Sequence, residues 1–459
     1  MCCSVVFVDI LRKKHKKLFL SLFLYIFAYK KVDIMIHSFS VENFLSIRDK
    51  QVISFEATKD KTNKDLLTVE VKPNCFINKL AIFYGANASG KSNLLYALET
   101  IFSLLIIPYF DKQQTIGKYS PFALKKGEST KFSVSFFIED IQYDYYIEYC
   151  LTHIVSERLY YYPTRNKALF YSRDFKDMNT RPKITFGTTL KLQLKSKRTI
   201  EENTLNNHTV LSTVAKVSLN SDSEKIINLH NWIINKVHNV DGDNRNRSMV
   251  YEMSKVCEDT RKKDFYLKLL SKADFNIIDF NIIDNNVPKD LIERIISIKE
   301  FSEEQKMAYL KNVAFVNSSK NGNFEVESQS QSDGTLRFTE LLDYLYDLVH
   351  ENHIYLFDEL GNRMHYDLMV YYLSLFLHNS EQSQLFFTTH SIMLLDEYFI
   401  RRDMIYLSEK ESNTASTSYN RVSEMGLHKN LSLFNAYKIG KLGAKPEIGS
   451  PYLMLNKNC

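Results

Sequence analysis

The chain has 459 residues, 44% of them hydrophobic and 25% charged, which is typical of a globular protein of two or three domains and excludes a largely disordered or fibrous chain. The formal net charge is +5, but residues 1–34 hold seven of the 59 basic and two of the 54 acidic residues, leaving 52 of each sign in the remainder. The overall charge therefore gives no support for nucleic-acid binding, which would need a local basic patch.

The first 34 residues differ in composition from the rest of the chain. A 12-residue, mostly apolar run from Leu18 to Tyr29 lies between clusters of lysine. A membrane-spanning helix needs about 20 apolar residues, and no small-residue cleavage site follows the run. We therefore interpret residues 1–34 as a non-native or disordered extension, with translation beginning at Met35. A monotopic membrane anchor is the alternative.

Residues 35–165 carry patterns that are typical of strands. From Lys131 to Tyr149, apolar and polar residues alternate around the central Glu139-Asp140 pair, as they do in a half-buried hairpin. The sequence therefore predicts an antiparallel β lobe in this region.

A phosphate-binding pattern interrupts these strands at Leu80–Phe102. The pattern G-x-x-x-x-G-K-[ST] runs from Gly85 to Ser92, between an apolar strand and a segment with leucines at helical spacing. Backbone N–H groups at such a strand-to-helix loop face one anion, and the helix dipole favours it. Lys91 can then reach the β- and γ-phosphates, while the Ser92 hydroxyl can ligate Mg²⁺. The predicted nucleotide-binding residues are Gly85, Ala86, Asn87, Ala88, Ser89, Gly90, Lys91, Ser92 and Asn93.

A long insertion separates the P-loop from the next candidate motifs. Residues 190–310 turn polar, with apolar residues at helical spacing, and no heptad register persists over three or four repeats. A short helical lobe is expected there rather than a coiled coil. The basic run Lys191–Arg198 is read as a strand or loop with a solvated face. Loops are expected at Asn239–Ser248 and Ser318–Asn323.

Two carboxylates follow the apolar strand Ile354–Phe357. Asp358 in this position can hold Mg²⁺, and Glu359 can orient and deprotonate a water molecule against a γ-phosphate. Alone, an Asp-Glu pair at a strand end is as often a solvated strand terminus as a catalytic site.

Two further polar segments flank this pair. Ser332, Gly334 and Thr335 lie at the start of an apolar helical stripe, where a plain helix cap is the simpler interpretation. His390 follows the predicted strand Leu385–Phe387, and a lone histidine there is more often structural than functional. The order of all four motifs is what favours a function for each.

That order resembles the ABC-type ATPase heads of the SMC, Rad50 and RecF group. More narrowly, the chain resembles the AAA15 family of bacterial ATPases, many of which are associated with abortive infection and other anti-phage systems. The segments that carry the resemblance include "MIHSFSVENFLSI" from Met35, the P-loop, "SDGTLR", "FDELGNRMH", "FFTTHSIMLLD" and "YKIGKLGAKP". The implied fold is α/β: a P-loop NTPase with an ABC/SMC-type head, split by a helical insertion and carrying an antiparallel β lobe.

The resemblance also implies roles for individual residues. Lys91, Glu359 and His390 would be catalytic, with Glu359 as general base and His390 as the switch that senses the γ-phosphate. Ser92 and Asp358 would hold the metal. Ser332, Gly334 and Thr335 would form the signature, which caps the ATP held by the P-loop of another subunit.

Two features depart from the family pattern. Leu45 stands where the family often has an arginine, and the glutamine of the usual Q-loop has no clear position, with Gln113, Gln114 and Gln142 as candidates. Contacts to adenine are therefore left open.

The expected organisation has five parts. They are the extension at 1–34, the N-terminal half of the head with its β lobe at 35–165, a mixed and then helical insertion at 166–310, the C-terminal half of the head with signature, Walker B and histidine switch at 311–410, and a C-terminal tail at 411–459.

We expect a cytoplasmic ATPase that uses ATP and Mg²⁺ and works as a homodimer or higher homo-oligomer. Its six cysteines are scattered without a CxxC pair, which fits a reducing compartment and gives no sign of a zinc site or disulfide framework.

The expected role is a sensor or scaffold of an anti-phage system that controls a separate, nuclease-type effector. A RecF- or Rad50-like DNA repair ATPase is the first alternative, although net charge does not support DNA binding. The ATPase subunit of a membrane transporter is the second, although no transmembrane segment is expected.

Overall fold

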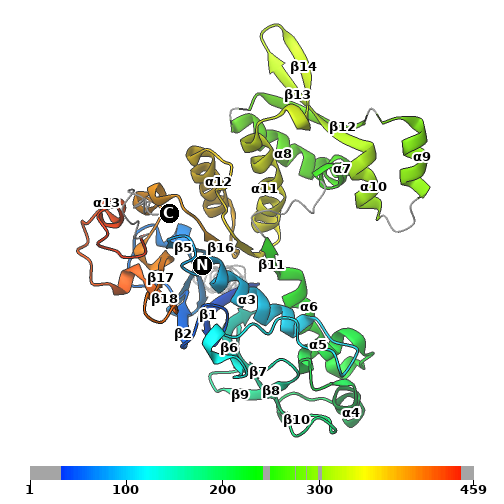
Figure 1. Cartoon of the computed structure of the whole chain (residues 1–459), viewed down its shortest axis with the longest axis vertical. Coiled ribbons are helices and arrows are strands. Elements are labelled where there is room, and N and C mark those ends of the chain that lie inside the picture. Colours follow the sequence, from blue (N-terminus) through cyan, green and yellow to red (C-terminus); the bar gives the residue numbers. More distant parts are fainter. Residues whose placement is uncertain (1–32, 241–248, 274, 286, 298–301, 446–459) are drawn as a thin grey trace, which may run out of the picture.

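The computed structural model describes residues 33–240, 249–273, 275–285, 287–297 and 302–445 (Figure 1). Residues 1–32 of the expected extension lie outside the described residues. Strand β1 begins at Ile34, which is fully buried, so the first strand starts inside the segment that the sequence assigns to the extension. In the described part of the chain, no helix is both long and apolar enough to cross a membrane.

A six-stranded sheet forms the centre of the molecule. Its order is β11 (Val237–Val240), β15 (Ile354–Phe357), β16 (Gln384–Thr388), β5 (Leu80–Gly85), β17 (Ile405–Lys410) and β18 (Thr417–Arg421). The first five strands are parallel, and only β18 is antiparallel to its neighbour. Strands β5, β15 and β16 are buried throughout, as expected for parallel strands that are covered on both faces.

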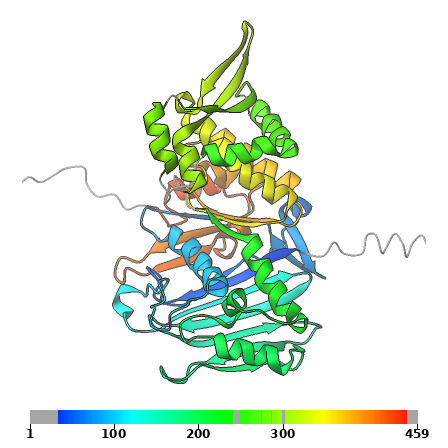
Figure 2. The same cartoon turned by 90° about the vertical axis from the view of Figure 1, so that its right-hand side faces the viewer.

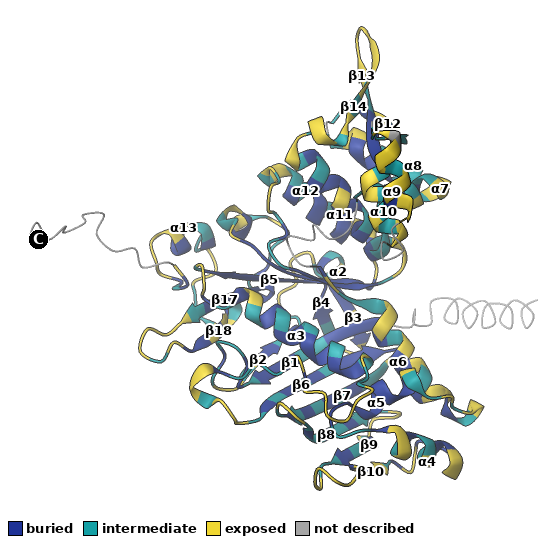
Figure 3. Ribbon diagram, turned by 45° about the vertical axis from the view of Figure 1, so that its right-hand side comes forward, coloured by how far each residue is buried: buried dark blue, intermediate teal, exposed yellow. Residues whose placement is uncertain are grey.

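Helices cover both faces of this core sheet (Figure 3). Helix α3 (Lys91–Ile106) packs on one face, and α11 (Asp333–His350) and α12 (Tyr366–Asn379) pack on the other. The buried side chains form two cores that divide along the sheet, because residues alternate between its faces: Ala81 and Phe83 join the α3 core, whereas Leu80 and Ile82 join the α11–α12 core.

A seven-stranded antiparallel sheet packs against the other side of α3. Its strands, in the order β10-β9-β8-β7-β6-β1-β2, are Lys183–Phe186, Ala168–Asp174, Ile154–Tyr161, Ile141–Tyr149, Thr130–Ile138, Ile34–Glu42 and Gln51–Ser54. The predicted hairpin is confirmed as β6 and β7, in which Val134 pairs with Tyr145. Beside this sheet lie α4 (Leu194–Asn203), α5 (Val210–Thr213) and α6 (Glu224–Lys236), and a short hairpin, β3 (Thr68–Lys72) and β4 (Cys75–Asn78), follows α2 (Lys64–Leu67).

The rest of the insertion forms a lobe at the opposite end of the elongated molecule (Figures 1 and 2). Its elements are α7 (Met249–Glu258), α8 (Thr260–Lys272), β12 (Ile277–Asp284), α9 (Lys289–Ser297), α10 (Glu303–Leu310), β13 (Lys311–Ser319) and β14 (Gly322–Glu327). Strands β12, β13 and β14 form an antiparallel sheet that the sequence interpretation does not include, because it expected helices up to residue 310 and the C-terminal half of the head from residue 311. Strands β13 and β14 also take up both ends of the loop expected at Ser318–Asn323.

Three other details differ from the expectations. Lys191–Arg198 runs into helix α4 rather than a strand or loop. The expected loop at Asn239–Ser248 begins inside strand β11, and its residues 241–248 lie outside the described residues. Strand β18 lies beyond residue 410, so the core sheet continues into the expected tail, which also contains α13 (Leu433–Lys438). The predicted class is confirmed: an α/β fold with a parallel core sheet and an antiparallel β lobe.

A buried glutamine links the core sheet to the seven-stranded sheet and to the β3–β4 hairpin. Gln384, the first residue of β16, accepts a hydrogen bond from Ile36 N at 2.6 Å. Its Nε2 donates to Ile36 O at 3.0 Å and to Asn78 O at 3.2 Å. The side chain is fully buried, so water cannot replace these bonds.

We expect Gln384→Leu to lower the free energy of unfolding by roughly 2–4 kcal/mol, because buried main-chain groups of Ile36 and Asn78 lose their partners while side-chain volume changes little. Urea denaturation followed by circular dichroism measures the change. The matched control is Gln113→Leu at an exposed position, where the shift should stay within about 0.5 kcal/mol. Equal stabilities of the two variants would contradict the proposed link between the sheets.

Candidate nucleotide-binding site

The predicted site residues meet at the carboxyl ends of three adjacent strands. The P-loop follows β5, Asp358 and Glu359 follow β15, and His390 lies two residues after β16. Because β15, β16 and β5 are parallel neighbours, their carboxyl ends lie at the same edge of the sheet. This edge is where open α/β sheets place their ligands.

The P-loop is a tight turn that leads into α3. Gly90, which caps the helix, has φ +101°, a conformation that side chains other than glycine rarely adopt. A Cβ there would also lie 2.6 Å from Thr417 Oγ1. Lys91 is buried and turned back on the loop: its Nζ donates to Gly85 O and Ala86 O, both at 2.9 Å. Burial lowers the pKa of Lys91, although two nearby carboxylates oppose that shift.

Strands β17 and β18 form hydrogen bonds with the P-loop. Thr417 Oγ1 donates to Ser89 O at 2.9 Å, and the Tyr419 hydroxyl donates to Gly90 O at 2.6 Å. The hydroxyls of Ser89 and Ser408 lie 2.6 Å apart. The sequence interpretation did not include Thr417 and Tyr419, because it placed them in a tail. The hydrogen bonds from Thr417 and Tyr419 fix the carbonyl groups of Ser89 and Gly90. The N–H groups of the loop are left to face an anion.

An open cleft adjoins the first half of the P-loop. Its lining comes from Ala86–Ser89, the turn between β1 and β2, the β17–β18 hairpin and residues 440–445. The cleft leaves room beside the loop for the part of a nucleotide that extends beyond its phosphates.

Asp358 is the centre of the polar cluster. Ser92 Oγ donates to Asp358 Oδ1 at 2.8 Å, and Thr388 Oγ1 donates to the same oxygen at 2.6 Å. The two predicted metal-binding residues, Ser92 and Asp358, are therefore in direct contact. A hydroxyl and a carboxylate are the hard oxygen ligands that Mg²⁺ prefers, so this pair fits the ion.

Glu359 and His390 lie at the solvent side of this cluster. Glu359 has φ +54°, a strained backbone for a residue with a side chain, and its N–H donates to Thr388 Oγ1 at 2.8 Å. His390 Nε2 is 3.5 Å from Glu359 Oε1, and both side chains are about half exposed. Burial, followed by the charge of Lys91, lowers the pKa of His390, although the nearby carboxylates of Glu359 and Asp358 oppose that shift. The strained backbone of Glu359 is typical of functional positions.

The signature residues cap helix α11. Thr335 N donates to Ser332 Oγ at 3.1 Å, and the two hydroxyls are 2.8 Å apart. Ser332 is exposed, and a Cβ on Gly334 would meet Arg363 O at 3.4 Å. Within the described ranges, the side-chain hydrogen bonds of Ser332 and Thr335 stay at this helix terminus, and none of them joins the signature to the P-loop of its own chain.

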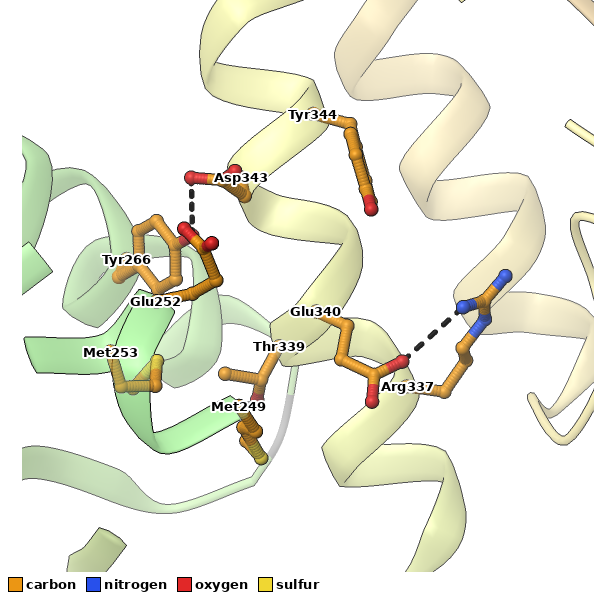
Figure 4. A pocket seen from close by; sticks show the side chains of 9 residues that line it. All are labelled: Met249, Glu252, Met253, Tyr266, Arg337, Thr339, Glu340, Asp343 and Tyr344. Carbon is orange, nitrogen blue, oxygen red and sulfur yellow. Dashed lines mark hydrogen bonds and ion pairs between the residues drawn. The ribbon is translucent and has the colours of Figure 1, made fainter. Parts of the chain in front are cut away.

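The signature helix packs against the inserted lobe further along its length. Figure 4 shows residues that line a cavity between α11 and α7: Met249 and Met253 lie on α7, whereas the Arg337 side chain extends from α11 on the side away from them. Arg337 is buried and donates from Nη1 to Glu340 Oε2 at 3.2 Å. Its Nε and Nη2 have no hydrogen-bond partner among the described residues. Arg337 is the last residue of the segment "SDGTLR", but the sequence analysis assigns no role to its side chain.

Among the described residues, none of the three candidate Q-loop glutamines forms a side-chain hydrogen bond to the P-loop. Gln113 and Gln114 lie beyond Ile106, the last residue of α3, which is the helix that begins at the P-loop. Gln142 lies on β7, where it hydrogen-bonds to Ser135 and Lys72. Leu45 adopts φ +51° and donates its N–H to Ser120 O.

The Thr388 hydroxyl provides a test of this geometry. We expect Thr388→Val to lower the rate of ATP hydrolysis about 10–100-fold, because both Asp358 and the Glu359 N–H lose a partner. Steady-state phosphate release and binding of a fluorescent ATP analogue separate the loss of rate from a loss of affinity.

Thr389→Val is the matched control, because the Thr389 hydroxyl accepts a hydrogen bond from Ser391 N and touches neither carboxylate in the described structure. The control should hydrolyse ATP at close to the wild-type rate. If the two valine variants lose activity equally, the assigned role of Thr388 is wrong.

Comparison with known proteins identifies the family. The family model AAA_21, described as "AAA domain, putative AbiEii toxin, Type IV TA system", matches residues 80–396. No curated protein matches the chain.

Solved SMC heads align with most of the chain at low identity. An SMC head domain from Thermotoga maritima is 11% identical, with a TM-score of 0.38, over 84% of this chain and 98% of that one. An SmcHead bound to the C-winged helix domain of ScpA is 12% identical, with a TM-score of 0.38, over 84% and 97%. An Smc head with an extended coiled coil, bound to the C-terminal domain of ScpA derived from Pyrococcus furiosus, is 13% identical, with a TM-score of 0.34, over 90% and 100%. The AAA_21 match spans more than half of the chain, which therefore belongs to this family and contains an AAA-type ATPase domain on an α/β P-loop NTPase fold.

Proposed function

We propose that the protein binds and hydrolyses ATP with Mg²⁺. The observation that carries this proposal is the contact of Ser92 and Thr388 with one carboxylate oxygen of Asp358, directly beside the P-loop. Ser92 and Asp358 would hold the Mg²⁺, which would neutralise charge on the phosphate oxygens when bound. Lys91 already lies within the loop, and rotation away from Gly85 O would bring its Nζ to the β- and γ-phosphates.

Glu359 is the proposed general base. Its side chain is about half exposed at the edge of the cluster, where a water molecule can reach it. The hydrogen bond from its N–H to Thr388 fixes its backbone relative to Asp358. His390, 3.5 Å from Glu359, is placed to donate a hydrogen bond to a terminal phosphate and so to sense its presence.

We further propose that two copies of the chain enclose each nucleotide. The exposed N-terminus of α11, with Ser332, Gly334 and Thr335, would close over the nucleotide on the P-loop of the partner. Backbone N–H groups and the positive end of the helix dipole make this terminus suited to a phosphate. Ser332 is exposed, and its hydrogen bonds leave the outer side of the terminus open. ATP would then hold the copies together, and hydrolysis would release them.

The cellular role that we propose is a cytoplasmic sensor or scaffold of an anti-phage system of the AAA15 type. The description of the matched family, "putative AbiEii toxin, Type IV TA system", supports a role in defence rather than in transport. The effector would be a separate, nuclease-type protein, because no nuclease constellation is evident in the sequence outside the ATPase motifs.

Replacing the proposed base tests the dimer. We expect Glu359→Gln to bind ATP but to hydrolyse it at least about 100-fold more slowly, and therefore to accumulate as a dimer with ATP and Mg²⁺. Analytical ultracentrifugation with ATP, with ADP and without nucleotide measures the mass.

A second change in the same background tests the signature. Ser332→Arg should return the Glu359→Gln variant to a monomer without weakening ATP binding. The exposed Ser271→Arg on α8 is the matched control and should leave the dimer intact. A Glu359→Gln variant that hydrolyses ATP at the wild-type rate would refute the base, and a dimer that survives Ser332→Arg would refute the signature in trans.

The defence role is tested in cells that carry the gene with its neighbours. We expect Lys91→Ala to abolish tight ATP binding and protection against phage, because the P-loop loses its only lysine. Plaque counts measure protection, and Lys112→Ala at an exposed position is the control that should remain protective. Unchanged plaque counts for both, together with hydrolysis that duplex DNA stimulates, would favour a DNA repair ATPase instead.

A further inference from the structure

Three side chains with metal-binding atoms meet at the junction between the β lobe and the β3–β4 hairpin. His37 lies on β1, Glu56 follows the end of β2, and Cys75 is the first residue of β4. One ligand atom from each lies within 4.8 Å of the other two, and His37 Nε2 is 3.2 Å from Glu56 Oε2. None of these residues takes part in the proposed ATPase site.

Main-chain hydrogen bonds hold the three residues in register. Phe55 N donates to His37 O at 2.8 Å, and Ala57 N donates to Phe76 O at 2.7 Å. Phe55 and Ala57, the two neighbours of Glu56 in the chain, are therefore hydrogen-bonded to β1 and to β4, respectively. The Glu56 carbonyl in turn accepts a bond from Arg421 Nη2. Relative positions set by the backbone in this way do not depend on the binding of an ion.

We propose that His37, Glu56 and Cys75 form a binding site for a zinc-type divalent cation. A nitrogen, an oxygen and a sulfur ligand suit Zn²⁺ or Co²⁺ and not Mg²⁺ or Ca²⁺, which prefer oxygen alone. Ligand atoms about 2.0–2.3 Å from a tetrahedral ion lie roughly 3.3–3.8 Å from one another, a spacing that small side-chain rotations from the present positions produce. A thiolate and a carboxylate together balance the charge of the ion.

The surroundings of the three residues fit this assignment. Ser38 Oγ is 3.3 Å from His37 Nδ1, and a hydrogen bond there orients the ring and leaves Nε2 free to bind an ion. Cys75 is 6% exposed, whereas the Glu56 side chain is 49% exposed. One side of the site is thus dry and the other is open, so an ion can enter and a water molecule can complete its coordination.

A bound ion would join three segments that precede the P-loop. It would fix the β3–β4 hairpin, which leads directly into β5, to the seven-stranded sheet. Binding to the folded state alone raises the stability of the fold in proportion to the logarithm of the ion concentration. The inference is independent of ATP hydrolysis, and its test uses no nucleotide.

The test is titration of the metal-free full-length protein with Co²⁺ and Zn²⁺. To exclude thiols outside the described residues, Cys2, Cys3 and Cys459 are replaced by serine throughout. We expect one Co²⁺ per chain with a thiolate-to-cobalt charge-transfer band, displacement of Co²⁺ by Zn²⁺, and a rise in melting temperature with Zn²⁺ but not with Mg²⁺.

Variants assign the signal to the site. Cys75→Ser should remove the charge-transfer band, and Glu56→Gln, an isosteric change at a half-exposed position, should weaken Co²⁺ binding at least about 10-fold without disturbing the fold. Cys150→Ser is the matched control, because Cys150 Sγ lies 3.2 Å from His153 Nδ1 and offers a second sulfur–nitrogen pair. A band that survives Cys75→Ser, or that disappears with Cys150→Ser, would overturn the proposal, as would failure of Co²⁺ to bind at millimolar concentration.

Discussion

The pairing of β15 with β16 and of β16 with β5 is the constraint on which the nucleotide site depends. These parallel ladders bring together residues that are more than 260 positions apart in the chain, such as Ser92 and Asp358. Thr388, at the end of the middle strand, donates to Asp358 and accepts from the N–H of Glu359. A shift of β16 by one residue would turn that side chain to the opposite face and separate the three motifs.

Much of this fold could be predicted from the sequence, where local patterns are strong. The apolar runs of β5 and β15 and the alternation of β6 and β7 identify strands because burial imposes the pattern directly. Strand β11 was missed because it follows α6 without a turn residue and covers only Val237–Val240. The run Lys191–Arg198 was misread because α4 keeps only Ser196 and Ile200 buried, so its apolar stripe is too narrow to indicate a helix.

The candidate site likewise contains residues that could be predicted from the sequence and residues that could not. Lys91, Ser92 and the carboxylates after β15 lie in motifs whose spacing reports their chemistry. Thr388 enters the sequence analysis only within the segment "FFTTHSIMLLD", because its role comes from two partners that follow another strand, β15. His37, Glu56 and Cys75 belong to no sequence motif: they come from three separate segments of the chain, and the absence of a CxxC pair says nothing about a site assembled in this manner. The signature in trans remains a prediction, since its proposed ligand belongs to a second copy.

The hydrogen bonds between the P-loop and strands β17 and β18 have a consequence for biosynthesis. Ser89 and Gly90 receive their hydrogen bonds from Thr417 and Tyr419, which the ribosome adds more than 300 residues later. Strand β5 likewise gains its neighbours β16 and β17 only in the last quarter of translation. A nascent chain stalled before Thr417 therefore carries the complete glycine-rich motif but cannot yet hold it in the shape that cradles phosphate.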